Sequence, residues 1–271
     1  MNFQSFDTIS VSVREQIRQL TAIWEKHLGD ALVGVYIHGS MALGRFREGV
    51  SDLDALIVSA RRIPKSQRLA ITRDILRLDC RPCPLELSAI RTDDLKPWHH
   101  PTRCQYHYSD YHRENYERLL SGELSEYPLV DQDFEDPDIA CHVRLTRQRG
   151  IRVCGKPIDE VFPEVPEADF VDSLCRDVES YDFHACQPRY FASNILGLGR
   201  VLSYLKERRI LSKYVAGIWA AGYVPEACRP IVESALRAWY ADEPMPETDP
   251  ARLEQLRLFL IEEIRQNNPS L

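Results

Sequence analysis

Short apolar runs mark the first part of the chain. Two of them, at residues 31–37 and 53–58, are rich in β-branched side chains, which predicts two buried strands. A third run, at residues 84–90, alternates leucines with Glu86 and predicts a third strand. On a strand, this alternation places Glu86 on the face opposite to its leucine neighbours.

Helical periodicity surrounds these strands. Residues 8–27 and 66–78 carry apolar positions at helical spacing, which predicts one amphipathic helix before the first strand and another between the second and third. The later helix is long enough to be a crossover, so the second and third strands can lie side by side. Another helix is predicted at residues 136–149, followed by an extended segment at 151–155.

The remainder of the chain shows helical periodicity alone. Ser212 is an N-cap candidate, and Asp249 before a proline marks a second helix start. The sequence therefore predicts an α+β protein, with a mixed sheet and flanking helices over residues 1–157 and an all-α helical bundle over residues 158–271. The predicted helices of this second domain cover residues 167–181, 189–208, 212–221, 225–240 and 250–266.

The overall composition limits the partners. A net charge of −7 argues against a broad nucleic-acid interface and suits a small cationic substrate better. No apolar run approaches the ~20 residues that span a bilayer, so we expect no membrane segment. Because residues 1–12 lack the basic and apolar regions of a signal peptide, the prediction is a cytoplasmic protein, which we expect to be a monomer.

Cysteine and histidine residues suggest metal or redox chemistry only weakly. Cys80 and Cys83 form a C-x-x-C pair, a spacing found in redox pairs and in half of a zinc site, but no second pair accompanies it. We therefore favour reduced, structural thiols. Residues 93–120 are aromatic and histidine-rich without the spacing of a zinc site, so we expect these aromatic side chains to line a ligand cleft or to sit half buried.

Residues that suit phosphate and metal chemistry lie between the first two strands. Gly39 and Ser40 follow the first strand, where a small, flexible residue lets backbone N–H groups approach a phosphate. Asp52 and Asp54 alternate at the start of the second strand, so their carboxylates share a face and suit a hard cation such as Mg²⁺. The combination predicts phosphoryl or nucleotidyl transfer with one or two Mg²⁺ ions.

Glu86 has two interpretations. A single glutamate in a strand can simply face solvent. Alternatively, Glu86 lies beside Asp52 and Asp54 on a neighbouring strand, as a third metal ligand or as the base that accepts a proton from an attacking hydroxyl.

The pattern Gly-Ser, eleven residues, then Asp-x-Asp resembles the nucleotidyltransferase superfamily related to DNA polymerase β. A closer resemblance, which extends over nearly the whole chain, is to the aminoglycoside adenylyltransferases of the streptomycin/spectinomycin type. The segments that carry it are 33–40 (VGVYIHGS), 51–54 (SDLD), 81–86 (RPCPLE), 95–98 (LKPW), 153–157 (VCGKP), a weaker match ending at Arg200, and 211–219 (LSKYVAGIW).

This resemblance implies transfer of AMP from ATP to a hydroxyl of an aminocyclitol antibiotic, spectinomycin and/or streptomycin, with two Mg²⁺ ions and antibiotic resistance as the result. It implies that Glu86 is the catalytic base and that Asp52 and Asp54 hold the metal ions. The nucleotide-binding residues it implies are Gly39, Ser40, Ser51, Asp138, Arg200, Lys213 and Trp239. The antibiotic-binding residues it implies are Glu86, Tyr111 and Asp182.

Two departures from the family pattern lie where the antibiotic would bind. Members that accept streptomycin as well as spectinomycin have a tryptophan where this chain has Tyr111. Acidic residues that the pattern places before the Arg200 helix align with Cys186 and Tyr190, although Asp182 is close by. Two alternatives stay open: a nucleotidyltransferase with a different small-molecule or protein acceptor, and a catalytically silent nucleotide-binding or toxin–antitoxin partner.

Overall fold

The computed structural model describes residues 9–179, 181, 188–241 and 243–268. The chain divides into two compact units, Met1–Phe170 (unit 1) and Val171–Leu271 (unit 2). The division falls within helix α9 (Glu167–Glu179), whereas the sequence places a domain boundary after residue 157, which stays a prediction.

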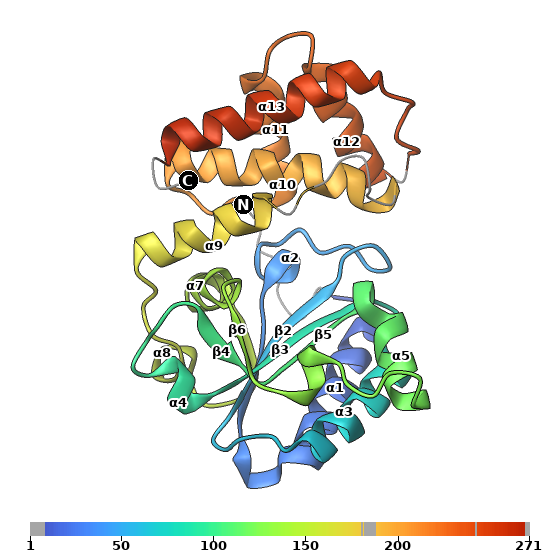
Figure 1. Cartoon of the computed structure of the whole chain (residues 1–271), viewed down its shortest axis with the longest axis vertical. Helices are drawn as coiled ribbons and strands as arrows, with labels where there is room; N and C mark the ends of the chain where they lie inside the picture. Colours follow the sequence, from blue (N-terminus) through green and yellow to red (C-terminus); the bar gives the residue numbers. More distant parts are fainter. Residues whose placement is uncertain (1–8, 180, 182–187, 242, 269–271) are drawn as a thin grey trace. The chain divides into compact units, whose positions relative to one another are not determined.

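Unit 1 is built around a five-stranded sheet with the strand order β5-β3-β2-β1-β7 (Figure 1). Strands β2 and β3 are parallel, while β1 is antiparallel to both β2 and β7, and β3 is antiparallel to β5. The predicted mixed sheet is therefore confirmed. The strands are β1 (Leu32–Ile37), β2 (Leu53–Ser59), β3 (Leu85–Arg91), β5 (Tyr106–Ser109) and β7 (Ile151–Gly155).

One face of this sheet packs against two long helices, α1 (Val11–Leu28) and α3 (Lys65–Leu78) (Figure 1). Ser10 caps α1, because its Oγ accepts a hydrogen bond from the Val13 amide at 3.2 Å. Trp24 of α1 is fully buried in the core between the helices and the sheet. As predicted, α3 is the crossover between the parallel strands β2 and β3.

Helix α7 (Ile139–Arg149) packs on the opposite face of the sheet, over a smaller core. This core includes Leu56 and Val58 of β2, which alternate with residues of the larger core. Both faces of β2 are thus buried along most of its length, which explains its continuous apolar sequence. By the same alternation, Asp54 lies on the α7 face at the start of β2.

The remaining elements of unit 1 are short. A second sheet pairs β4 (Thr102–Cys104) with β6 (Phe134–Asp136). The other helices are η2 (Gly29–Ala31), α2 (Gly39–Ala42), α4 (Thr92–Leu95), η3 (Asp110–His112), α5 (Arg113–Ser121), α6 (Pro128–Asp131) and α8 (Ile158–Val161).

The aromatic segment differs from its sequence-based expectation. Tyr106, Tyr108 and Tyr116 are fully buried rather than half buried in a cleft. Pairing of β5 with β3 turns Tyr106 and Tyr108 toward the main core, where Tyr106 meets Trp24 edge-on at 5.8 Å and Tyr108 stacks on Tyr116 at 4.7 Å between ring centroids. These tyrosines are therefore structural.

In the part that the structure describes, unit 2 forms helices only, which confirms the predicted all-α region. Both predicted N-caps are confirmed: Ser212 Oγ accepts from the Val215 amide at 3.3 Å, and Asp249 Oδ1 from the Ala251 amide at 3.0 Å. None of the described helices is long and apolar enough to cross a membrane. The helices α10 (Pro188–Glu207), α11 (Lys213–Tyr223), α12 (Arg229–Ala241) and α13 (Pro250–Asn267) pack with α10 against the other three.

Candidate active site

Two carboxylates lie side by side at the start of the parallel strands β2 and β3. Asp54 is the register partner of Glu86, and both side chains are partly buried. The strand starts are held together because the Leu53 amide donates to the Pro84 carbonyl at 2.8 Å. Asp52 lies just before β2 and is exposed. The prediction that Glu86 lies next to Asp54 on a neighbouring strand is therefore confirmed.

The turn after β1 sits directly on Asp54. The amide of His38 donates to the Asp54 carbonyl at 3.0 Å, which joins the end of β1 to β2. Gly39 follows with a φ of +59°, and a Cβ atom added there would lie 1.8 Å from Asp54 Oδ2. Only glycine accommodates both this backbone conformation and this close approach.

The two serines of the predicted nucleotide set differ in their surroundings. Ser40 Oγ is buried and has no hydrogen-bond partner among the residues that the structure describes. Ser51 Oγ accepts from the Arg47 amide at 3.0 Å, and the Ser51 amide donates to the Arg47 carbonyl at 2.8 Å. Ser51 therefore closes the loop that leads into Asp52, whereas Ser40 keeps a buried hydroxyl available for a ligand.

The structure brings together three histidines that the sequence did not connect: His38, which is buried, and His107 and His142, which are partly buried. The rings of His38 and His142 lie 4.7 Å apart, and burial, followed by the charge of His142, lowers the pKa of His38 well below its usual value. Burial also lowers the pKa of His107 to about 3, and its Nδ1 lies 3.1 Å from Ser88 Oγ. The rings of His38 and His107 are therefore neutral at physiological pH. The position of His38 directly before Gly39 is the one sequence signal that could have identified this group.

In unit 2, the structure brings two predicted nucleotide-binding residues together. Lys213 begins α11, and its Nζ lies 5.2 Å from the centre of the Trp239 ring and donates to Ser193 Oγ at 2.6 Å. Arg200 lies on α10, which packs against α11 and α12.

Two other predicted site residues, Asp138 and Tyr111, are exposed. Asp138 is at the N-cap position of α7 and is exposed, and its amide donates to Asp136 Oδ1 at 3.0 Å. Tyr111, in η3, is 65% exposed and meets the His112 ring edge-on. Asp182 lies outside the described residues.

Neither thiol of the C-x-x-C pair is poised for redox chemistry. Burial and the neighbouring carboxylates of Asp79 and Asp110 raise the pKa of Cys80 to about 12, and burial also raises the pKa of Cys83. Both thiols are thus protonated at neutral pH. The Cys83 backbone is instead held by Gln16, whose Nε2 donates to the Cys83 carbonyl at 2.7 Å.

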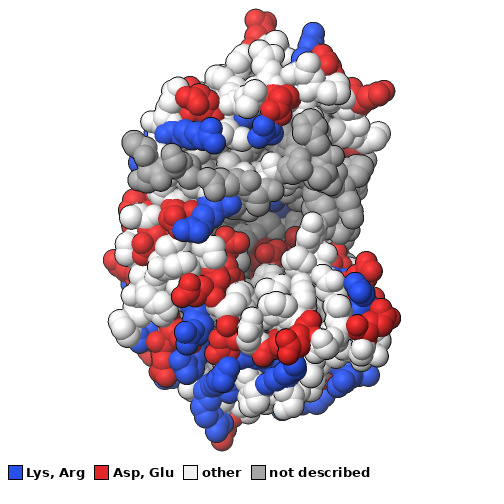
Figure 2. Space-filling view, in the orientation of Figure 1, with Lys and Arg blue, Asp and Glu red and all other residues white. Residues whose placement is uncertain are grey.

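On the visible face of unit 1, acidic and basic side chains are interspersed (Figure 2).

Two family models match the chain. One described as "Nucleotidyltransferase domain" matches residues 17–94, and one described as "Aminoglycoside adenylyltransferase, C-terminal domain" matches residues 160–263. The sheet, the Gly-Ser turn and these matches define the chain as a nucleotidyltransferase. Over 83% to 94% of its length, the chain also resembles curated aminoglycoside and spectinomycin adenylyltransferases, at 23% to 26% identity.

Two curated relatives and one solved structure show how similar the chain is to known proteins. The chain is 23% identical over 264 residues to the aminoglycoside (3'') (9) adenylyltransferase of Klebsiella pneumoniae, covering 94% of each chain. It is 26% identical over 234 residues to the spectinomycin 9-adenylyltransferase of Campylobacter jejuni, covering 83% of this chain and 84% of that one. The crystal structure of the spectinomycin adenyltransferase AAD(9) from Enterococcus faecialis with ATP and spectinomycin has the same fold, with a TM-score of 0.81 at 22% identity over 93% of this chain and 99% of that one.

Proposed function

We propose that the protein is a Mg²⁺-dependent O-adenylyltransferase that transfers AMP from ATP to a hydroxyl of an aminocyclitol antibiotic, spectinomycin and/or streptomycin, and so gives antibiotic resistance. The observation that carries this proposal is the pairing of Asp54 with Glu86, with the Gly39 turn seated against Asp54. Relatives named as an aminoglycoside adenylyltransferase and as a spectinomycin adenylyltransferase support it.

The donor set fits magnesium and a nucleotide. Asp52 and Asp54 supply the carboxylate oxygens that Mg²⁺ prefers, and we assign them to two Mg²⁺ ions. When bound, the ions would neutralise charge on the phosphates of ATP. The buried, unpartnered Ser40 Oγ supports a phosphate nearby, because a buried hydroxyl without a partner is costly. We also assign Gly39, Ser51 and Asp138 to the nucleotide.

We assign the proton transfer to Glu86. As the base, it accepts the proton of the acceptor hydroxyl while the hydroxyl oxygen attacks the α-phosphorus and pyrophosphate leaves. Glu86 is partly buried and lies in register between Asp54 of β2 and Ser109 of β5, on the face of the sheet that carries Asp54. We propose that Arg200 and Lys213 pair with phosphate oxygens.

Aromatic and acidic side chains are assigned to the adenine ring and to the acceptor. Trp239, beside Lys213, is assigned to the adenine ring. We assign Tyr111 and Asp182 to the antibiotic, because an exposed aromatic ring and a carboxylate suit a sugar-like cation. The protein is proposed to act as a cytoplasmic monomer. The alternative is a nucleotidyltransferase with a different small-molecule or protein acceptor, favoured by the departures at Tyr111, Cys186 and Tyr190.

A panel of aminocyclitols and aminoglycosides tests the proposal. Thermal unfolding is measured with MgATP alone and with MgATP plus each drug, and pyrophosphate release is followed in parallel. We expect MgATP to raise the unfolding temperature, spectinomycin or streptomycin to raise it further, and pyrophosphate release to depend on the drug. A response to MgATP with no response to any drug would favour the alternative acceptor, and no response to MgATP would contradict both.

A further inference from the structure

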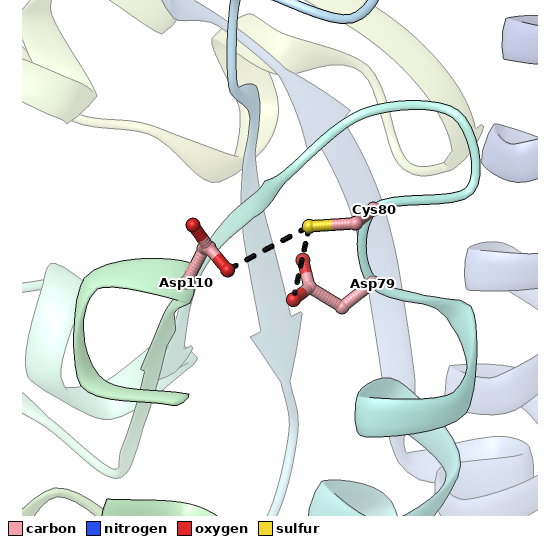
Figure 3. Close-up of side chains that lie close together, drawn as sticks. All are labelled: Asp79, Cys80 and Asp110. Atoms are coloured by element: carbon pink, nitrogen blue, oxygen red, sulfur yellow. Dashed lines mark hydrogen bonds between the residues drawn. The ribbon is translucent and has the colours of Figure 1, made fainter. Parts of the chain in front are cut away.

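A cluster in unit 1 lies outside the residues assigned above. Cys80 Sγ lies 3.6 Å from Asp79 Oδ2 and 3.6 Å from Asp110 Oδ1, so its single S–H proton lies within reach of both carboxylates (Figure 3). Asp79 and Cys80 form the turn that follows α3, whereas Asp110 begins η3 after β5. The cluster therefore joins two segments that are far apart in the sequence.

Asp79 is the centre of this junction, with a side chain that is fully buried. Its Oδ1 accepts from the Leu85 amide at 2.8 Å, and its Oδ2 accepts from Arg113 Nη1 at 2.6 Å. The Arg113 guanidinium already balances the charge of Asp79. It would also repel a metal ion bound by Asp79, Cys80 and Asp110. We therefore assign the cluster a positioning role rather than a metal.

The two residues that donate to the Asp79 carboxylate, Leu85 and Arg113, lie close in sequence to residues that the proposed function uses. Leu85 directly precedes Glu86, and Arg113 follows Tyr111 by two residues. Strand pairing adds a second connection, because Glu86 is the register partner of Ser109, whose Oγ accepts from the Tyr111 amide at 3.3 Å. The base and the assigned antibiotic-binding tyrosine therefore share one local framework.

Arg113 is well suited to hold this framework in place. Besides Asp79, its guanidinium donates to the Leu76 carbonyl of α3 at 3.1 Å and to Glu117 Oε1 of α5 at 3.0 Å. The pair with Asp79 has one fully buried partner, while Glu117 is exposed, so the first contact is screened far less than the second.

We propose that the Asp79–Arg113 ion pair is a positioning device that fixes segment 109–113, with Tyr111, relative to Glu86 and so determines how well the acceptor binds and reacts. The inference rests on the proposed function, because it concerns the acceptor side of the same site. Asp79 and Arg113 act through their neighbours and need not touch the substrate. A displacement of about 1 Å in such a framework can cost about 10²-fold in rate.

Steady-state kinetics of Arg113 variants test this. We expect Arg113→Met to lower kcat/KM for spectinomycin by about tenfold or more and to change the KM for ATP by less than about twofold, since the ion pair anchors the segment that carries Tyr111. Arg113→Lys should recover part of the loss because it restores the charge. The matched control is Glu117→Gln, which removes the exposed partner of the same arginine and should leave both constants unchanged.

Amide hydrogen exchange gives a readout that does not depend on activity. In Arg113→Met, exchange should accelerate at Leu85 and in residues 109–113, and it should stay at the wild-type rate in Glu117→Gln. Unchanged exchange and unchanged acceptor kinetics would overturn the proposal. Equal losses toward ATP and acceptor, or an unfolded Arg113→Met, would assign the pair to general stability and overturn it as well. A wild-type protein inactive toward every drug would contradict the proposed function alone, and exchange would still decide the coupling.

Discussion

Replacement of Gly39 by alanine tests the geometry of the site most sharply. The new Cβ would lie 1.8 Å from Asp54 Oδ2, whereas real Cβ atoms essentially never approach a heavy atom closer than 3.0 Å. The carboxylate or the turn must therefore move by about 1.2 Å, and a misplacement of this size predicts a loss of about 10²-fold in kcat/KM for ATP, or ~2.7 kcal/mol of barrier. The left-handed backbone adds about 1–2 kcal/mol of strain to the folded state.

A control separates the clash from the strain. Gly122 has a φ of +84° and would place its Cβ with no atom within 4 Å, so Gly122→Ala introduces the strain alone. Pyrophosphate release and urea unfolding are measured for both variants. We expect both to lose stability and only Gly39→Ala to lose activity beyond its loss of folded protein. Full activity in Gly39→Ala, or equal activity losses in both variants, would refute the placement of the turn against Asp54.

Stability should fall below neutral pH because folding lowers the pKa values of His38 and His107 and so keeps both rings neutral. Below pH 6.5 the unfolded chain binds the extra protons, so the free energy of unfolding should drop by about 1.4 kcal/mol per histidine between pH 7.5 and 5.5, and an unchanged urea midpoint would contradict this. Ser40→Ala should raise the KM for ATP severalfold without loss of stability, because Ser40 Oγ has no hydrogen-bond partner among the described residues. A destabilised variant with a normal KM for ATP would show that Ser40 serves the fold instead. Lys213→Met should raise the KM for ATP about tenfold. The control is Lys206→Met, because Lys206 Nζ also lies over an aromatic ring, 5.1 Å from the centre of Tyr223. This variant should leave the KM for ATP unchanged, and equal effects of the two variants would refute the role of Lys213.

Local patterns were sufficient to predict most of the elements that carry the site. The apolar runs before Gly39 and after Asp54, and the alternation around Glu86, predicted strands that the structure contains as β1, β2 and β3. A helix-length connection predicted that β2 and β3 could be neighbours, and their register confirms the adjacency of Asp54 and Glu86. These features depend on residues close together in the sequence, so periodicity reveals them.

Features that depend on tertiary pairing could not be predicted in the same way. Tyr106 and Tyr108 have polar tips and suggested a cleft, but the register of β5 against β3 decides which face they occupy. The His38–His142 contact and the Asp79–Arg113 ion pair join residues from distant elements, and no local period marks them. The individual roles of the site residues likewise stay predictions that depend on the proposed chemistry.

The central claim is adenylyl transfer to an antibiotic hydroxyl with Glu86 as the base. Mass spectrometry of spectinomycin and streptomycin after incubation with the protein, ATP and Mg²⁺ tests it most directly. We predict that at least one drug gains the mass of one adenylyl group, and that Glu86→Gln slows its formation by about 10²-fold or more. An unmodified drug in every reaction would contradict the claimed acceptor, and equal product formation by Glu86→Gln would contradict the claimed base.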